Sequence, residues 1–210
     1  MAASALIIAL ISPITGAIAD AAGRRKPWVG GFTVLTVIAT ALLWFAEPDA
    51  AWTIPVLVLV VLVNIGFETS TVFYNAMLPD LAPPHRMGRL SGWAWGLGYA
   101  GGIACLALAL VVFILPDQAP FGLDEVPSGG VRVAALLAAG WLIVFGWPMF
   151  VFTPDRPSAR LPVTTAIARG WRRLIETGRE LSRHKQILRF LAARLLYIDG
   201  LNTLFALGGI

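Results

Sequence analysis

The chain has 210 residues, of which 58% are hydrophobic and only 13% are charged, with a formal net charge of +4. A soluble domain needs a more polar surface than this composition supplies, so a lipid bilayer is the expected solvent. The basic residues occur in short runs between apolar blocks rather than on one surface, which excludes nucleic acid as a partner.

Apolar blocks that are long enough to cross a bilayer recur along the whole chain. A spanning helix needs roughly 20 apolar residues to cross a hydrocarbon layer about 30 Å thick. By that measure the sequence predicts five or six spans, at about residues 2–22, 28–45, 53–81, 88–115, 131–152 and from 186 to the end. The predicted fold class is therefore all-α, a polytopic transmembrane helix bundle.

A proline pair separates the third predicted span from the fourth. We expect the segment Ala82-Pro83-Pro84-His85-Arg86 to break the helix, because prolines remove backbone donors and disfavour helix in the residues before them. Met1 lies inside the first apolar run and no polar tail follows the last one. We therefore expect the chain to be a piece of a longer protein.

Lysine and arginine are concentrated in alternate links between the spans. The links 23–27, 82–89 and 153–189 hold 14 of the 16 basic residues, whereas the opposite links hold only acids. Arg132 lies just beyond one acidic link, and Arg194 lies inside the last span. Short translocated loops disfavour basic residues, so the basic links are expected in the cytoplasm. We expect the protein to be a multi-pass protein of a bacterial cytoplasmic membrane.

The segment from residue 163 to residue 183 is too charged to span a bilayer. Apolar residues recur there at helical spacing opposite a row of arginines, namely Ile167, Trp171, Leu174, Ile175 and Leu181. This pattern predicts an amphipathic helix along the cytoplasmic membrane surface. A role in gating and a role as a plain connector both remain open.

An acid, a glycine and three cations surround the turn between the first and second spans. The stretch reads Gly16-Ala-Ile-Ala-Asp20-Ala-Ala-Gly23-Arg24-Arg25-Lys26. Gly23 permits a tight turn, the cations can anchor to the membrane surface, and Asp20 can pair with a cation or a helix N-terminus. The stretch resembles the loop signature of the major facilitator superfamily, although Ala21 stands where that family usually has a basic residue.

That resemblance implies a role for these residues in conformational change. In the superfamily, the acid and the cations latch the two halves of the transporter together in the outward-facing state. By resemblance, the conformational switch would be formed by Gly16, Asp20, Gly23, Arg24, Arg25 and Lys26.

Further stretches, at residues 73–81, 89–92, 96–102 and 197–205, resemble the branch that contains fungal vacuolar amino-acid effluxers and related bacterial permeases. The resemblance implies a partial major-facilitator fold in which these spans are helices two to seven of twelve. Residues 1–152 would be five helices of the N-terminal bundle, 153–185 a cytoplasmic linker, and 186–210 the first helix of a truncated C-terminal bundle. The missing remainder of that bundle would then be a partner.

Polar residues form a stripe on the third span. Asn64, Glu68, Thr71 and Asn75 lie within roughly 60° of arc, and Glu68 lies about 18 Å before Asp80, near the membrane midplane. These residues are predicted to bind the substrate, with Glu68 binding an amine or carrying a coupled proton. A purely structural role in helix packing is the alternative.

The last span carries a second polar pair. Asp199 and Asn202 share one helix face, and we expect them to face the same transport cavity. Polar contacts between helices are the alternative for this pair.

Glycines repeat at four-residue spacing in the fourth span, at Gly92, Gly96, Gly98 and Gly102. Such spacing lets helix backbones approach closely, so these glycines are predicted to serve helix packing. His85, His184 and Cys105 lie singly, so no metal site, disulfide or cofactor is predicted.

The function predicted from the sequence is secondary active transport of small solutes by alternating access. The resemblance suggests amino acids as substrates, and a cation-coupled sugar symporter is the alternative. An inactive fragment and an intramembrane enzyme are alternatives from other classes. An enzyme is not expected, because the sequence holds no HExxH pair and no GxSxG elbow.

Overall fold

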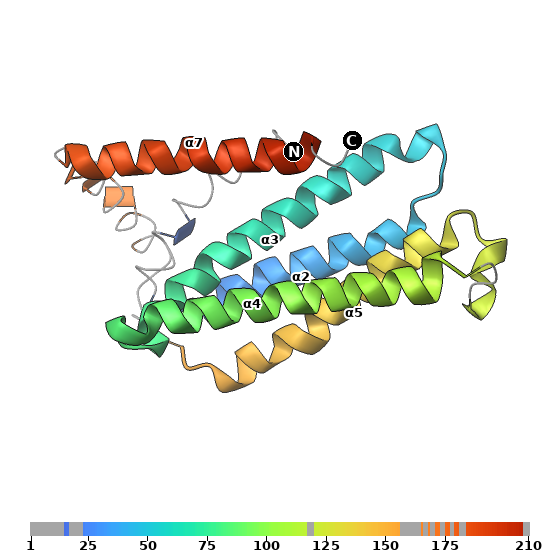
Figure 1. The fold of residues 1–210 in the computed structure, drawn as a ribbon, viewed down its shortest axis with the longest axis horizontal. Helices are drawn as coiled ribbons and strands as arrows, with labels where there is room; N and C mark the ends of the chain where they lie inside the picture. Colours follow the sequence, from blue (N-terminus) through green and yellow to red (C-terminus); the bar gives the residue numbers. More distant parts are fainter. Residues whose placement is uncertain are drawn as a thin grey trace.

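The computed structural model describes residues 15–16, 23–116, 120–155 and 184–207, together with residues 165, 168, 171–172, 175–176 and 179–180. The long helices are α2 (Lys26–Leu42), α3 (Thr53–Leu81), α4 (Pro84–Ala109), α5 (Gly129–Phe152) and α7 (Lys185–Leu207) (Figure 1). Short 3-10 helices are η1 (Leu43–Phe45), η2 (Ala50–Trp52) and η4 (Pro120–Glu125), and η3 (Leu110–Ile114) is a π-helical turn. The described residues contain no strand, so the predicted all-α class is confirmed.

Four segments of the described chain are long and apolar enough to cross a membrane: Lys26–Phe45, Ala50–Leu81, Pro84–Ile114 and Gly129–Phe152. They correspond to the second to fifth predicted spans. The first predicted span lies outside the described residues, except for Thr15 and Gly16, which are helical. The sixth corresponds to α7, and its crossing of the membrane stays a prediction.

The break between α3 and α4 is shorter than the proline pair suggests. Ala82 and Pro83 are extended, and Pro84 is already the first residue of α4. Proline is well tolerated at the first position of a helix, because the N–H that it lacks would have no partner there. The prediction that Pro84, His85 and Arg86 interrupt the helix was therefore wrong.

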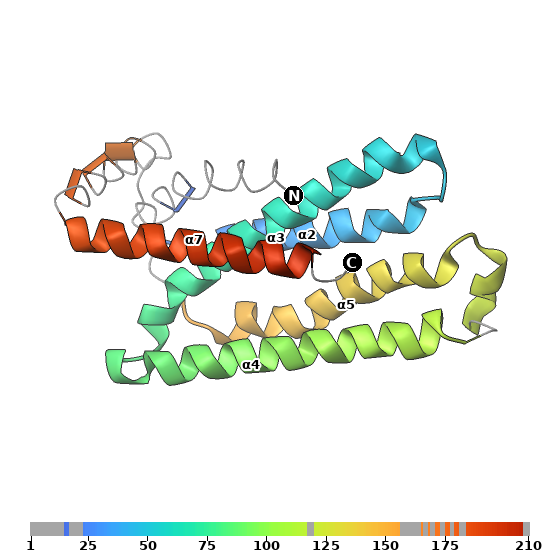
Figure 2. The same ribbon diagram turned by 45° about the horizontal axis from the view of Figure 1, so that its top comes forward.

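The helices run back and forth between two ends of the bundle, which we name by their links. The basic end holds residues 23–25, 82–83 and 153–155, and the acidic end holds residues 46–49, 115–116 and 120–128. Between them α2 packs against both α3 and α5, and α4 lies alongside α5 (Figure 2). Helix α7 lies on the α3 side of the bundle (Figures 1 and 2).

The apolar core lies near the basic end, between α2, α3 and α5. Its buried residues are Val29, Phe73 and Met77, with partly buried Trp28, Phe32, Met149 and Phe150 packed around them. The Phe73 ring lies 5.8 Å from the Trp28 ring and 6.0 Å from the Phe32 ring, measured between centroids. Many large apolar side chains elsewhere are exposed, as lipid-facing helices require.

Helices α2 and α3 approach each other closely at Gly66. A Cβ atom added there would lie 2.5 Å from the Thr36 hydroxyl oxygen and 2.9 Å from the Phe32 carbonyl oxygen. One turn away, the hydroxyls of Thr33 and Ser70 are hydrogen-bonded at 3.1 Å. Helices α2 and α3 are thus joined through small residues and hydroxyl groups, which are typical of helix contacts in membranes.

Replacing Gly66 with alanine should destabilise the bundle by roughly 1–3 kcal/mol, because the added methyl group must push α2 away from α3. The measurement is the thermal unfolding midpoint of the purified protein in detergent micelles. Gly98→Ala is the matched control, since a Cβ at Gly98 meets no atom within 4 Å. Equal midpoints for both variants would contradict this account of the α2–α3 contact.

Candidate functional site

Charged residues from three helices meet at the basic end. We call the contacts among Arg24, Arg25, Lys26, Asp80 and Asp155 the basic clasp. Arg24 and Arg25 precede α2 and Lys26 begins it, Asp80 lies in the last turn of α3, and Asp155 follows α5. Oppositely charged groups therefore converge from segments that are far apart in the sequence.

The Arg25 side chain connects the start of α2 to the end of α3. Arg25 is only 7% exposed, and its Nη1 donates to the Asp80 carboxylate at 3.0 Å and to the Ala76 carbonyl oxygen. A cation near the last turn of a helix is favoured by the helix dipole. Burial of the guanidinium is tolerated because it is both ion-paired and hydrogen-bonded.

Asp155 connects the start of α2 to the end of α5. Its carboxylate accepts the backbone N–H of Arg25 at 3.0 Å and that of Lys26 at 3.3 Å, and it lies 4.0 Å from the Arg24 Nε. The side chain of the N-cap residue Arg25 does not accept a hydrogen bond from the first turn of α2. The Asp155 carboxylate, which follows α5, caps this helix instead. The Lys26 ammonium makes a second contact between α2 and α5 by donating a hydrogen bond to the Phe150 carbonyl oxygen at 2.8 Å.

The structure brings together only part of the switch predicted from the sequence. Gly23, with a φ of 82°, makes the left-handed turn that presents the three cations to their partners. Gly16 is helical, and a Cβ there would meet no atom within 4 Å. Asp20 lies outside the described residues. The sequence reasoning missed Asp80 and Asp155 as partners, although each acid directly borders a basic link.

The polar stripe of α3 lies on the side of this helix that faces away from α2 and the apolar core. The α3 face buried against its neighbours carries Gly66, Thr69, Phe73 and Met77. At 100° per residue, the stripe formed by Asn64, Glu68, Thr71 and Asn75 is centred roughly 170° away from that face. Glu68 and Asn75 are exposed, while Asn64 and Thr71 donate to carbonyls of their own helix at 2.8 and 2.9 Å.

The structure does not test the roles predicted for the polar pair of α7 and for the glycines of α4. Asp199 and Asn202 belong to α7, but their side chains lie outside what the structure describes. Cβ atoms added at Gly92, Gly96, Gly98 and Gly102 would meet no atom within 4 Å, so their packing role stays a prediction. Gly101 is the α4 glycine that faces a neighbour, with the Trp141 indole nitrogen 3.8 Å from an added Cβ.

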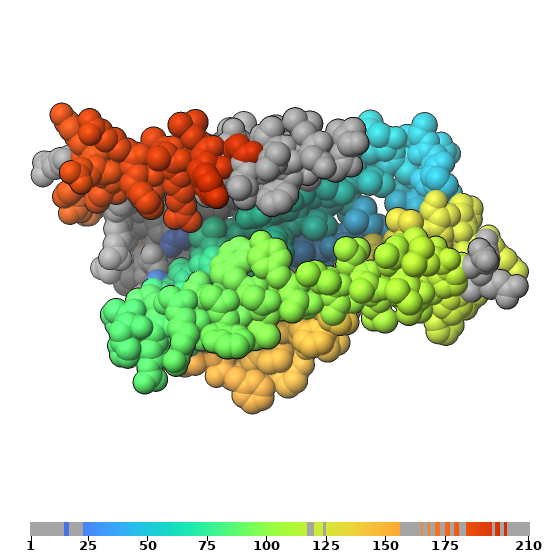
Figure 3. Space-filling view, viewed as in Figure 1, coloured from blue at the N-terminus to red at the C-terminus, as the bar shows by residue number. Residues whose placement is uncertain are grey.

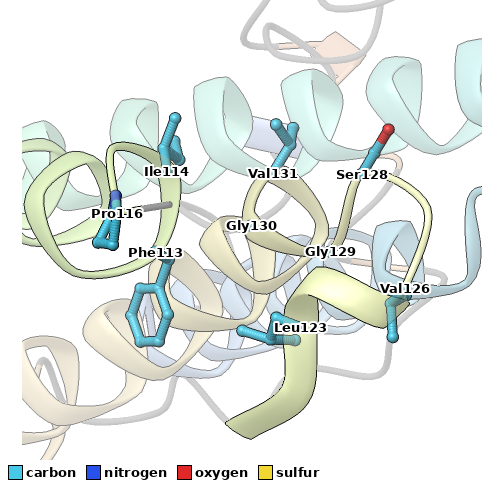
Figure 4. Close-up of a pocket in the computed structure, with 9 residues that line it drawn as sticks. All are labelled: Phe113, Ile114, Pro116, Leu123, Val126, Ser128, Gly129, Gly130 and Val131. Carbon is cyan, nitrogen blue, oxygen red and sulfur yellow. The ribbon is translucent and has the colours of Figure 1, made fainter. Parts of the chain in front are cut away.

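A pocket of about 270 Å³ lies at the acidic end, between η3, η4 and the start of α5 (Figure 4). Its lining residues are Phe113, Ile114, Pro116, Leu123, Val126, Ser128, Gly129, Gly130 and Val131. Ser128 is the only lining residue with a polar side chain, so the pocket offers no charge for an ionic solute. Within the described ranges, no three His, Cys, Asp or Glu side chains are grouped as a metal would require.

Comparison with known proteins gives one consistent family. The family model described as "Vacuole effluxer Atg22 like" matches residues 1–209. The chain is 30% identical over 207 residues to YxiO of Bacillus subtilis, which is named an uncharacterized MFS-type transporter. It is 30% identical over 127 residues to autophagy-related protein 22-1 of Neosartorya fischeri, and 24% identical over 164 residues to autophagy-related protein 22 of Yarrowia lipolytica.

These matches differ in how much of each protein they cover. The match to the Bacillus protein covers 99% of this chain and 47% of the relative, so the chain spans about half of that relative's length. The matches to the fungal proteins cover 55% and 67% of this chain, and 19% and 26% of those relatives. No solved structure matches the chain.

Replacing Asp155 with alanine should lower stability by roughly 1–2 kcal/mol, because α2 loses its cap and its tie to α5. The thermal unfolding midpoint in detergent micelles measures this loss. Asp155→Asn keeps an acceptor without the charge and should fall between the alanine variant and the wild type.

Asp49→Ala is the control, because Asp49 also accepts a backbone N–H, but from Ala51 only two residues away. Its loss should change the midpoint less than the loss of Asp155. A larger effect at Asp49 would mean that Asp155 does not join the helices.

Proposed function

The chain belongs to the family of Atg22-like vacuole effluxers, and on this premise we propose that it forms part of a secondary active transporter. The transporter moves small solutes across a membrane by alternating access between its two sides. The names of the relatives support transport in general, since one is an MFS-type transporter and the family is one of effluxers. Binding and movement of solute, rather than a chemical reaction, are therefore proposed.

The observation that carries this proposal is the basic clasp. It joins three membrane helices at one end through ion pairs and hydrogen bonds close to water, since the side chains of Arg24 and Asp80 are 60% and 28% exposed. The exposed ion pair of Arg24 with Asp155 can be exchanged for water at small net cost, whereas the buried pair of Arg25 with Asp80 holds α2 to α3. A junction of this kind suits a bundle that must open and close at that end.

The polar stripe of α3 is the proposed solute site. Its position opposite the buried face of α3 leaves Glu68 exposed, beyond the helices that the clasp joins. A carboxylate there can bind the amine of an amino acid or carry a coupled proton, so amino acids are the proposed solutes. Asp199 and Asn202 of α7 are proposed to face the same cavity.

The proposed membrane topology follows the distribution of charge. We place the basic end in the cytoplasm, as the positive-inside rule requires. Residues 153–185 then form a cytoplasmic linker between the helices of the N-terminal bundle and α7. The described residues of this linker between 165 and 180 are helical, and Trp171 and Ile175 are 55% and 43% exposed, which supports an amphipathic helix on the membrane surface.

Replacing Glu68 with glutamine should abolish accumulation of solute against its gradient, because the side chain can then neither carry a proton nor pair with an amine. The measurement is uptake of a radiolabelled amino-acid mixture into proteoliposomes, with the protein expressed from its complete gene and a pH gradient imposed. Glu47→Gln is the matched control, since Glu47 lies in the acidic link between α2 and α3. Unchanged rate, affinity and pH dependence in Glu68→Gln would show that Glu68 is structural.

A further inference from the structure

The link that follows α5 is strongly basic. Residues 153–189 hold nine of the 16 basic residues of the chain but only three acids, Asp155, Glu176 and Glu180. We call the helix predicted at residues 163–183 the linker helix, and every residue that the structure describes within it is helical. Such an excess of cations beside a membrane span suits a partner of negative charge.

The end of the linker helix is held beside the start of α7. The His184 Nδ1–H donates to the Glu180 carbonyl oxygen at 3.0 Å, because a carbonyl can only accept. The His184 carbonyl oxygen in turn accepts the backbone N–H groups of Ile187 and Leu188 in the first turn of α7, at 3.0 and 3.1 Å. Figures 1 and 2 show the described linker residues, in orange, at the end of the molecule where α7 begins, and Figure 3 shows orange side chains on the surface there. The linker helix therefore lies where the sixth predicted span leaves the membrane.

Apolar and basic side chains lie next to each other around the linker helix. At about 100° per residue, Ile175 lies roughly 40° around the helix from Trp171. In the same direction, Arg179 and Arg172 lie roughly 80° and 100° from Trp171. All four side chains are exposed. Arginines that border an apolar face reach lipid headgroups while the apolar side chains enter the acyl region, so this sector matches a membrane surface.

The two acids of the linker helix lie farther round from that sector. Glu176 and Glu180 are exposed, and they lie roughly 140° and 180° from Trp171 in the same direction. They balance Arg172 and Arg179 in charge, so the order of these four residues around the helix, and not their sum, makes the sector beside Trp171 basic. A carboxylate in that sector would repel an anionic headgroup. The described residues thus place cations, and not acids, next to the apolar edge.

We propose that the linker helix binds anionic phospholipids of the membrane surface. Arg172 and Arg179 contact the headgroup phosphates, because a guanidinium donates two parallel hydrogen bonds to phosphate oxygens. Trp171 and Ile175 enter the boundary of the acyl chains beside those headgroups. This inference rests on the proposed position of the linker at the membrane surface, and it names the lipid that binds there.

The test uses a spin label on the linker helix of the protein expressed from its complete gene, as Ala168→Cys in a Cys105→Ala background. Ala168 is exposed and lies roughly 60° from Trp171, so the label reports on the membrane-facing sector and leaves its apolar and charged residues intact. The protein is placed in vesicles of phosphatidylcholine alone or with phosphatidylglycerol, whose headgroup is anionic. Collision of the label with oxygen, which dissolves in lipid, and with a neutral nickel chelate, which stays in water, gives the ratio of lipid-bound to released linker helix.

We expect a higher lipid-bound ratio in the vesicles that contain phosphatidylglycerol. Arg172→Gln should lower that ratio roughly fivefold in these vesicles alone, which corresponds to the about 1 kcal/mol that one cation contributes near an anionic surface. Arg172→Lys keeps the charge and should restore most of the binding. Glu176→Gln is the matched control, because it also removes one charge from an exposed position, and it should not lower the ratio.

Equal ratios in the two kinds of vesicle, or an equal loss in both for Arg172→Gln, would overturn the inference, because lipid charge would then not matter. A loss in Glu176→Gln as large as that in Arg172→Gln would do the same. A label that collides with neither oxygen nor the nickel chelate would also overturn it, because another part of the transporter would then cover this sector. Transport is not measured, so failure here leaves the proposed function to its own test.

Discussion

The arrangement of α2, α3 and α5 depends on the buried guanidinium of Arg25. A buried cation costs several kcal/mol unless it is paired, so the end of α3 must bring Asp80 and the Ala76 carbonyl to it. The first backbone N–H groups of α2 need acceptors as well, and Asp155 supplies them from the end of α5. One short basic segment thereby fixes where two other membrane helices end.

Further contacts join α2, α3 and α5 along the rest of their length. The apolar core around Phe73 lies next to the clasp, and Gly66 keeps α2 and α3 in close contact further along. At the other end, Arg132 binds the end of α2, so α2 and α5 are joined at both ends. The polar stripe with Glu68 is left on the far side of α3, where the proposed solute site needs to be. The helix contacts of α3 and the exposed Glu68 thus lie on opposite faces of one helix.

The sequence predicted the second to fifth membrane spans because their signal is local. The third span was predicted at its observed bounds, from its long apolar stretch and from the proline pair that follows it. The clasp could be predicted only in part, because Asp80 and Asp155 lie 55 and 130 residues from Arg25 and meet it only once the helices pack. The π turn at Leu110–Ile114 had no signal, since its apolar residues fit an α-helix equally well. The start of α4 was misplaced because proline, unfavourable within a helix, is favourable at its first position.

The most direct measurement is the rate at which a thiol at position 76, beside the Arg25 contact, reacts with a membrane-impermeant reagent. The protein would carry Ala76→Cys and Cys105→Ala and would be labelled in membrane vesicles of each orientation. Our account predicts slow labelling from the cytoplasmic side, at least about tenfold faster in Arg25→Gln, since loss of about 1.4 kcal/mol from the closed state changes its population tenfold. Arg24→Gln should have a much smaller effect, because the Arg24 side chain is 60% exposed and its ion pair is long at 4.0 Å. Equal rates in the wild type and in Arg25→Gln, or labelling from the outer side alone, would contradict the account.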